Sequence, residues 1–283
     1  MRRFELGLHT RATHSLPVRA LFTCLTMIAV LLPESGVRAA DPVPVDLELV
    51  LAVDASASID VREAALQRAG YIAALTDKRV IERIAKGSFR RIAVAYVEWA
   101  GSQETIVDWT IIEDAASAEA FATALRAAPF HTGTVTSLSA ALEYSARLFE
   151  QNNIDSIRRV IDISGDGFNW AGRPIDITQP EIVAAGITIN ALPILRFDEN
   201  GRITNPGLDR YYRERVIGGP GAFLIPIHGT EAFPEAILRK LIIEIAGIAP
   251  SDLPQLARIP ADPFPAQNVD AAGRDNRRTD KRP

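Results

Sequence analysis

Strand-like apolar segments alternate with segments of helical periodicity along most of this chain, and that alternation restricts the fold to a few arrangements. Alternating strands and helices form a mostly parallel sheet with helices packed on both of its faces. The stretch between the second and third strand segments is short and holds Gly101 and Ser102, which is typical of a hairpin and predicts one antiparallel edge strand. The sequence therefore predicts a doubly wound α/β domain with a six-stranded sheet, the strands lying at residues 47–53, 91–99, 105–111, 160–164, 187–193 and 222–227.

Three segments carry apolar side chains at the spacing of an amphipathic helix. Asp60 and Glu63 stand at the start of the first segment in the pattern of a capping box, so we assign them to helix capping and not to metal binding. Residues 196–221 show no clear periodicity, and a long irregular segment is a candidate surface for specificity. The apolar helical positions are Val61, Ala65, Ala69, Ile72 and Leu75, then Phe121, Ala124, Leu125 and Ala128, and finally Ile237, Leu238, Leu241, Ile242 and Ile245.

Polar side chains follow two of the predicted strands, at the point where each strand ends. Asp54, Ser56 and Ser58 come directly after the first strand, and Asp166 follows the fourth. Because loops from separate strands converge at the carboxyl end of a parallel sheet, we expect these side chains to lie close together. Carboxylate and hydroxyl oxygens suit Mg²⁺, Mn²⁺ or Ca²⁺. Taken alone, the Asp-Ala-Ser-Ala-Ser motif also suits a helix-capping turn.

With these motifs the chain resembles the von Willebrand factor type A (VWFA) superfamily over residues 45–246. The metal-ion-dependent adhesion site (MIDAS) of that superfamily consists of an Asp-x-Ser-x-Ser motif, a Thr before a helix, and an Asp that ends a later strand. Superfamily members place the Thr six residues before a helical Leu or Ile, which selects Thr136 before Leu142, whereas counting from Gly133 selects Thr134. The resemblance implies the metal ligands Asp54, Ser56, Ser58, Thr136 and Asp166.

Other segments extend the resemblance. Residues 164–170, 186–193 and 211–223 resemble a bacterial subfamily that is classed only as a domain of unknown function. Gly165 departs from the superfamily pattern, since many relatives have Thr before this Asp. The subfamily resemblance implies a fold and a site but no biological role.

The predicted ligand set leaves room for a partner. Mg²⁺ takes six oxygen ligands, and five side chains, some acting through water, leave a position that faces solvent. Because three of the five are neutral hydroxyls, the two carboxylates only balance a divalent charge. The resemblance implies that an Asp or Glu of a partner protein fills the open position. The sequence thus predicts a metal-dependent protein-binding module with Mg²⁺ as the expected ion and Mn²⁺ or Ca²⁺ as alternatives.

An enzymatic function is the alternative, in which Asp54 accepts a phosphoryl group in a metal-dependent hydrolase or phosphatase. Such enzymes usually carry a second Asp two residues further on, where this chain has Ser56. No Gly-x-Ser-x-Gly motif is present. His131 precedes the Thr136 segment and is either a proton-transfer group or a polar loop residue. We therefore expect a binding domain and not an enzyme.

Three further residues near the predicted site have two interpretations each. Glu98 and Trp99 end the second strand, where they either pack or form a partner-binding rim, since exposed Trp is favoured at binding hot spots. Asp162 lies within a strand expected to be buried on both faces. It either supports a neighbouring loop or is satisfied inside the protein.

The first residues, 1–39, have the pattern of a signal peptide. Arg2, Arg3, Arg11 and Arg19 precede an apolar run at 20–32, and Val37-Arg38-Ala39 offers small residues to a signal peptidase. A bilayer span needs roughly 20 apolar residues, so an uncleaved anchor is the weaker alternative. We expect a periplasmic or secreted protein without stable membrane insertion, whose only cysteine, Cys24, is removed with the leader.

The formal net charge of −4 becomes more negative once this basic leader is removed. An acidic exported chain is a poor binder of nucleic acid. Residues 45–247 are expected to form one VWFA-like domain, and residues 250–283, rich in proline and charge, a disordered tail. The partner and the oligomeric state are left open.

Overall fold

The computed structural model describes residues 41–229 and 233–247. The predicted signal peptide and the predicted tail lie outside the described residues, so neither prediction is tested. Within the described part, no helix is both long enough and apolar enough to cross a membrane.

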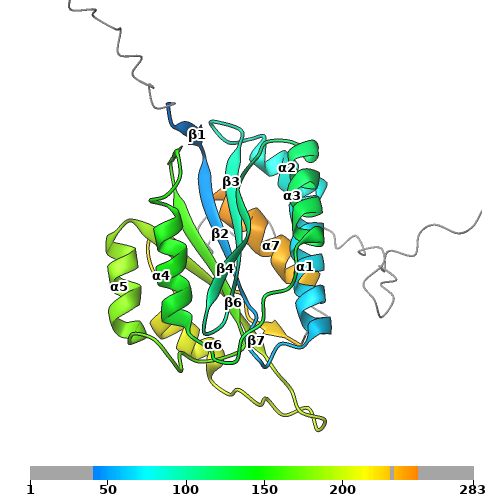
Figure 1. The fold of residues 1–283 in the computed structure, drawn as a ribbon, viewed down its shortest axis with the longest axis vertical. Coiled ribbons are helices and arrows are strands. Elements are labelled where there is room, and N and C mark those ends of the chain that lie inside the picture. Colours follow the sequence, from blue (N-terminus) through cyan, green and yellow to red (C-terminus); the bar gives the residue numbers. More distant parts are fainter. Residues whose placement is uncertain (1–40, 230–232, 248–283) are drawn as a thin grey trace, which may run out of the picture. The chain divides into compact units, whose positions relative to one another are not determined.

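A six-stranded sheet forms the centre of the domain, with helices on both sides (Figure 1). The strand order is β4-β3-β2-β6-β7-β8, and every neighbouring pair is parallel except β3 with β4. This confirms the predicted doubly wound α/β sheet and its one antiparallel edge strand. The strands are β2 (Leu47–Asp54), β3 (Ile92–Trp99), β4 (Gln103–Ile112), β6 (Arg159–Gly165), β7 (Ile187–Leu195) and β8 (Ile227–His228).

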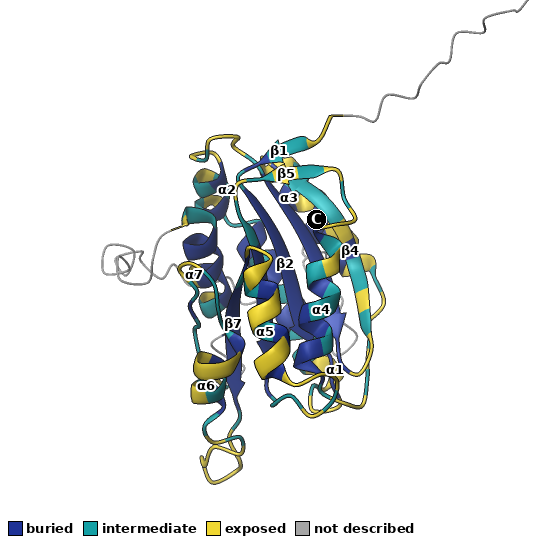
Figure 2. Ribbon diagram, turned by 90° about the vertical axis from the view of Figure 1, so that its left-hand side faces the viewer, coloured by how far each residue is buried: buried dark blue, intermediate teal, exposed yellow. Residues whose placement is uncertain are grey.

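Burial on both faces explains why the central strand β2 is apolar apart from Glu48 and the terminal Asp54. All of its residues are buried, and the apolar ones alternate between two separate hydrophobic cores. Leu49 and Leu51 point to one core and Val50 and Ala52 to the other, since successive side chains of a strand face opposite sides. Burial colouring shows the sheet covered by helices whose outer faces are exposed (Figure 2).

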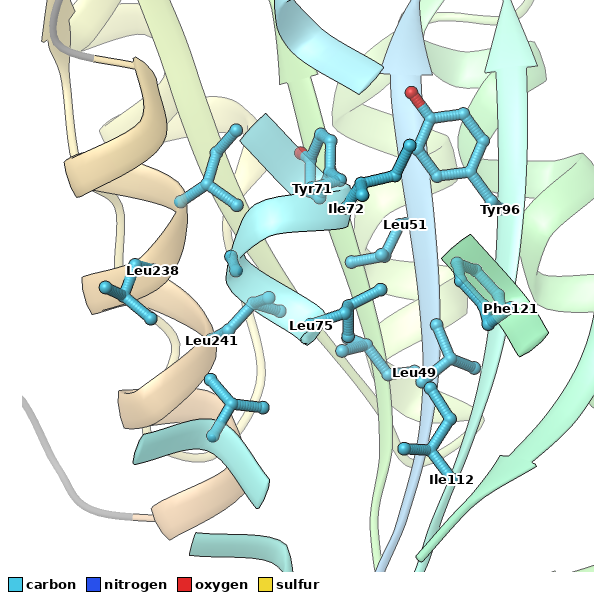
Figure 3. Packing of buried hydrophobic residues seen from close by; sticks show 14 of the residues in the cluster. Leu49, Leu51, Tyr71, Ile72, Leu75, Tyr96, Ile112, Phe121, Leu238 and Leu241 are labelled. Atoms are coloured by element: carbon cyan, nitrogen blue, oxygen red, sulfur yellow. The ribbon is translucent and has the colours of Figure 1, made fainter. Parts of the chain in front are cut away.

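The first core lies between the sheet and α1 (Val61–Leu75), α2 (Lys78–Ile84), α3 (Ala115–Ala127) and α7 (Phe233–Ala246). Here Tyr71 and Leu75 of α1 and Leu238 and Leu241 of α7 pack with the side chains of β2 (Figure 3). The second core lies beneath α4 (Leu138–Leu148), α5 (Ile175–Ala184), α6 (Leu208–Tyr211) and the π-helix at Tyr212–Val216. A small parallel sheet of β1 (Val43–Val45) and β5 (Ile154–Ser156), which the sequence did not predict, completes the described part.

Helix α1 begins directly after Asp60, as predicted from the capping box of Asp60 and Glu63. Glu63 N donates to Asp60 Oδ1 at 2.8 Å, and Asp60 N donates to Glu63 Oε2 at 3.3 Å. The predicted apolar face is wrong in its first turn, because Val61 is 72% exposed. The helix is buried through its second half instead, where Gly70 allows Ile237 of α7 to approach closely.

The last strand is shorter than predicted. Residues 222–227 were expected to be a strand, yet β8 begins only at Ile227. Leu224 makes an isolated bridge to Ala191, and Pro226, which has no N–H to donate, separates that bridge from β8. The irregular segment 196–221 also contains α6 and the π-helix, whose Tyr212 is fully buried.

Candidate metal site

The ends of β2 and β6 are neighbours in the sheet, and this brings two predicted ligands together. Asp54 is the last residue of β2, and Asp166 directly follows the last residue of β6. The N–H of Asp166 donates to Asp54 Oδ2 at 3.3 Å, and the N–H of Ser56 donates to Asp54 Oδ1 at 2.8 Å. The backbone thus holds Asp54 at the junction of the two loops.

The serine hydroxyls join these carboxylates in a chain of polar contacts. The Oγ atoms of Ser56 and Ser58 are 3.1 Å apart, and Ser58 Oγ donates to Asp166 Oδ1 at 2.8 Å. In an octahedral shell with metal–oxygen distances of about 2.0–2.1 Å, adjacent ligands are about 2.9 Å apart. The spacing and the hard oxygen atoms of this group therefore fit a Mg²⁺-sized cation.

Thr136 lies beside the segment that carries Asp166. A Cβ placed on Gly167 would come within 3.0 Å of Thr136 Cγ2 and 3.3 Å of its Oγ1, so Gly167 makes room for this side chain. The carbonyl of Thr136 accepts a hydrogen bond from Trp170 N at 3.1 Å. Thr134 is exposed, whereas Thr136 is partly buried. The loop before α4 is also tied to the Asp54 loop, because Gly133 N donates to the carbonyl of Ala55 at 3.1 Å.

The two carboxylates destabilise each other as long as both are charged. Asp54 is only 2% exposed, and its pKa is raised to about 7, first by burial and then by the negative charge of Asp166. Hydrogen bonds from the backbone oppose this shift without cancelling it. Among the described residues, no three His, Cys, Asp or Glu side chains form a group suited to a metal. A cation at this place would therefore rely on hydroxyl oxygens as well as on the two carboxylates.

Arg196 is a residue of this site that sequence reasoning missed. It directly follows β7, and its Nε donates to Asp166 Oδ2. The same guanidinium donates to the two carboxylate oxygens of Glu63 at 3.1 and 2.8 Å and to the carbonyl of Ser58 at 2.7 Å. A signal was present in the sequence, since Arg196 directly follows β7, the parallel strand next to β6, but no motif singled it out.

Gly165 has a structural reason for departing from the superfamily pattern. A Cβ at this position would lie 2.9 Å from Asp54 Oδ2, 2.9 Å from Tyr212 Oη and 3.0 Å from Trp99 Cζ2. The buried rings of Trp99 and Tyr212 therefore occupy the space that a Thr side chain would need. Tyr212 Oη also donates to the carbonyl of Gly167 at 3.3 Å.

Of the two interpretations of Glu98 and Trp99, packing is correct and the partner-binding rim is wrong. Glu98 is 3% exposed and Trp99 is fully buried, because β3 lies inside the sheet and both of its faces are covered. Glu98 accepts two hydrogen bonds from Arg68 and one from the N–H of His131. Neither residue is available as a rim for a partner, and both serve packing.

His131 and Asp162 have internal partners. The ring nitrogens of His131 lie 3.0 Å from Glu104 Oε2 and 3.2 Å from Ser102 Oγ, as expected of a polar loop residue. Asp162 forms a buried ion pair at 2.5 Å with Lys240 of α7. Of its two interpretations, the internally satisfied group is therefore the correct one.

Several exposed apolar side chains lie in segments that also carry residues of the candidate site. Trp170 is 75% exposed, and Phe168 contacts its ring at a centroid distance of 6.2 Å. Val61, at the start of α1, and Phe197, next to Arg196, are exposed as well. Val61 was predicted to lie on the apolar face of its helix, whereas Phe168, Trp170 and Phe197 lie outside the named helices and strands, where no periodicity distinguishes them.

Taken together, the sheet and the oxygen cluster at its carboxyl end define a VWFA-like α/β domain. The chain belongs to the family described as "Protein of unknown function (DUF1194)", whose model matches residues 44–249. This confirms the predicted subfamily. A search of curated proteins found no match.

Solved structures of similar fold come from distant proteins. Proximal thread matrix protein 1 from the mussel byssus, with a zinc-occupied MIDAS motif, is 15% identical with a TM-score of 0.54, covering 73% of this chain and 50% of the mussel chain. The pilus adhesin SpaC from Lactobacillus rhamnosus GG is 15% identical with a TM-score of 0.51, covering 74% of this chain and 31% of the adhesin. This chain thus spans half or less of these proteins, and at such identity the likeness shows the fold alone.

Proposed function

We infer that this protein is an exported, metal-dependent binding module that holds an Asp or Glu of a partner protein through a divalent cation. The observation that carries this function is the meeting of Asp54 and Asp166 with two serine hydroxyls at the carboxyl end of the sheet, at spacings near 3 Å. Mg²⁺ is the expected ion, and Mn²⁺ and Ca²⁺ are the alternatives.

The chemistry of the site favours capture of a carboxylate. Asp54, Ser56, Ser58 and Asp166 would hold the ion, directly or through water, with Thr136 completing the set. The bound cation would relieve the repulsion between the two buried carboxylates. Because the other side chains are uncharged hydroxyls, the ion would keep its attraction for an anionic oxygen of a partner.

The similar proteins support this class of function. The mussel matrix protein carries a metal in a motif of the same name, and SpaC is an adhesin. Export is supported by the signal-peptide pattern of residues 1–39. Nucleic acid and stable membrane insertion are not part of the proposal.

Hydrolysis at Asp54 is the less supported function. Both oxygens of Asp54 accept hydrogen bonds from backbone N–H groups, which holds the carboxylate as a fixed ligand. His131, the one proton-transfer candidate from the sequence, contacts Glu104 and Ser102 instead of Asp54.

Divalent metal is expected to stabilise the wild-type domain and to leave Asp54→Asn and Asp166→Asn unaffected. A ligand that binds only the folded state adds about 2.7 kcal/mol at a hundredfold excess over its dissociation constant. In a domain of this size that corresponds to a rise in Tm of about 5–10 °C. Mg²⁺, Mn²⁺ and Ca²⁺ would be titrated while thermal unfolding is followed.

Thr136→Ala and Thr134→Ala form a matched pair in the same loop. The first should weaken the metal response, and the second, at an exposed position, should not. If Asp54→Asn responds to metal as the wild type does, the ion binds elsewhere and the proposed site is wrong.

Peptides selected from a displayed random library on the wild-type protein in Mg²⁺ are expected to carry Asp or Glu beside apolar residues, and to be released by chelator. Trp170→Ala should lose these peptides but keep the metal response, because Trp170 is exposed beside the site and aromatic anchors dominate binding energy. Ile157→Ala changes another exposed apolar residue, before the amino end of β6, and is the control. Selected peptides without an acidic residue would contradict capture through the metal.

A further inference from the structure

All three guanidinium nitrogens of Arg196 donate hydrogen bonds to residues at the candidate site. Nε donates to Asp166 Oδ2, one terminal nitrogen donates to Glu63 Oε1, and the other donates to Glu63 Oε2 and to the carbonyl of Ser58. The side chain is 28% exposed, while those of its carboxylate partners are 3% exposed at Asp166 and 19% at Glu63. A positive charge therefore already lies against one of the proposed metal ligands.

The backbone keeps Arg196 in this position. Its N–H donates to Asn205 Oδ1 at 3.0 Å, and Asn205 Nδ2 donates to the carbonyls of Asp166 and Ile194 at 2.8 and 2.9 Å. Thr204 N donates to the carbonyl of Arg196 at 2.9 Å. The segment after β7 is thus fastened to the end of β6, which places the guanidinium beside the Ser58 loop.

Electrostatic repulsion disfavours simultaneous contact of Asp166 with a divalent cation and with the Arg196 guanidinium. Asp166 Oδ1 accepts the hydrogen bond of Ser58, and Oδ2 accepts that of Arg196, so both oxygens are engaged. A divalent ion that approaches Asp166 is repelled by the guanidinium in the same low-dielectric surroundings that strengthen the ion pair.

We propose that Arg196 is an intrinsic cation that competes with the divalent metal for Asp166, stabilising the metal-free site and lowering its affinity for metal. The inference rests on the proposed function, since it assigns a regulator to the same site. Metal binding then requires the Arg196–Asp166 ion pair to open. The strength of this pair therefore sets the metal concentration at which the module can bind its partner.

Direct Mn²⁺ binding, measured as free Mn²⁺ by electron paramagnetic resonance, tests the competition. Arg196→Gln is expected to bind Mn²⁺ at least tenfold more tightly than the wild type, and its metal-free form should unfold at a lower temperature. Arg196→Lys keeps the charge and should bind close to the wild type. Arg202→Gln, an exposed arginine of the same segment, is the control and should not change binding.

A second variant tests the same competition in case Arg196→Gln folds poorly. The double variant Arg196→Gln with Glu63→Gln removes the guanidinium together with a carboxylate that it neutralises, so the metal-free site carries less repulsion. It should still bind Mn²⁺ more tightly than the wild type.

The proposed competition would be overturned if Arg196→Gln and the double variant bound Mn²⁺ no more tightly than the wild type. It would also be overturned if Arg196→Lys bound Mn²⁺ as tightly as Arg196→Gln. If the wild type and Arg196→Gln both lack Mn²⁺ binding that depends on Asp54, the proposed function itself fails and this inference fails with it. Wild-type binding that Asp54→Asn abolishes, without tightening in Arg196→Gln, would refute only the role of Arg196.

Discussion

Replacing Lys240 with methionine is expected to lower the free energy of unfolding by about 3–5 kcal/mol at neutral pH. Lys240 is fully buried in α7, and its Nζ lies 2.5 Å from Asp162 Oδ1 and 2.5 Å from Glu244 Oε1. Asn190 Nδ2 adds a hydrogen bond to Glu244 Oε1 at 2.9 Å. Without the lysine, two carboxylates remain buried and unpaired inside the first core, which is costlier than the loss of the ion pairs alone.

The effect should depend on pH in a defined direction. Burial raises the pKa of Asp162, and burial together with the charge of Asp162 raises the pKa of Glu244 to about 7. Between about pH 4 and pH 7 the folded protein therefore keeps protons that the unfolded chain has already lost. Asp162 and Glu244 thus make the free energy of unfolding fall as the pH rises through this range. The loss in Lys240→Met should be smaller at acidic pH, because the stranded carboxylates can then be protonated.

Chemical denaturation at several pH values measures this effect. Arg239→Met, at the exposed neighbouring position of the same helix, is the control and should change stability by less than about 0.5 kcal/mol. A triple variant with Lys240→Met, Asp162→Asn and Glu244→Gln should recover part of the loss, since it removes all three charges. A loss below about 1 kcal/mol in Lys240→Met would mean that water reaches the cluster.

Replacing Arg68 with methionine is expected to cost a similar amount, about 3–5 kcal/mol. Arg68 is 4% exposed and forms a two-point ion pair with Glu98, at 2.6 and 2.9 Å. Its terminal nitrogens also donate to the carbonyls of Ala128 and Pro129, each at 2.7 Å, and its guanidinium lies 4.0 Å from the ring centre of Phe130. The substitution leaves a buried carboxylate and these carbonyls without their donor.

The consequence should extend toward the metal site. Glu98 also accepts the N–H of His131 at 2.8 Å, so the pair fastens the segment that leads from α3 to Thr136. Faster hydrogen exchange at residues 128–133 is therefore expected in Arg68→Met, alongside the loss of stability in denaturation. Arg62→Met, at an exposed position of the same helix, is the control. Unchanged exchange in this segment would show that other contacts hold it.

The order of elements could be predicted because burial leaves a local pattern. The apolar character of β2 follows from its burial between the two cores, and the hairpin between β3 and β4 follows from the short connection at Gly101 and Ser102. The same reasoning misplaced the first turn of α1, where Val61 has an apolar side chain that the described residues leave 72% exposed. It also extended the last strand across Pro226, whose missing N–H interrupts the pairing.

The sequence by itself determined the alternation of strands and helices that forms the α/β domain and the placing of Asp54 and Asp166 at strand ends, because strand periodicity and strand-end motifs are local features of the sequence. Only the tertiary structure decided which charges meet. Arg196 reaches Glu63 across 133 positions of sequence, Lys240 reaches Asp162 from another element, and Glu98 is covered by Arg68 instead of facing solvent. Such pairs depend on how separate elements pack, and a single side chain carries no local sign of the partner that neutralises it.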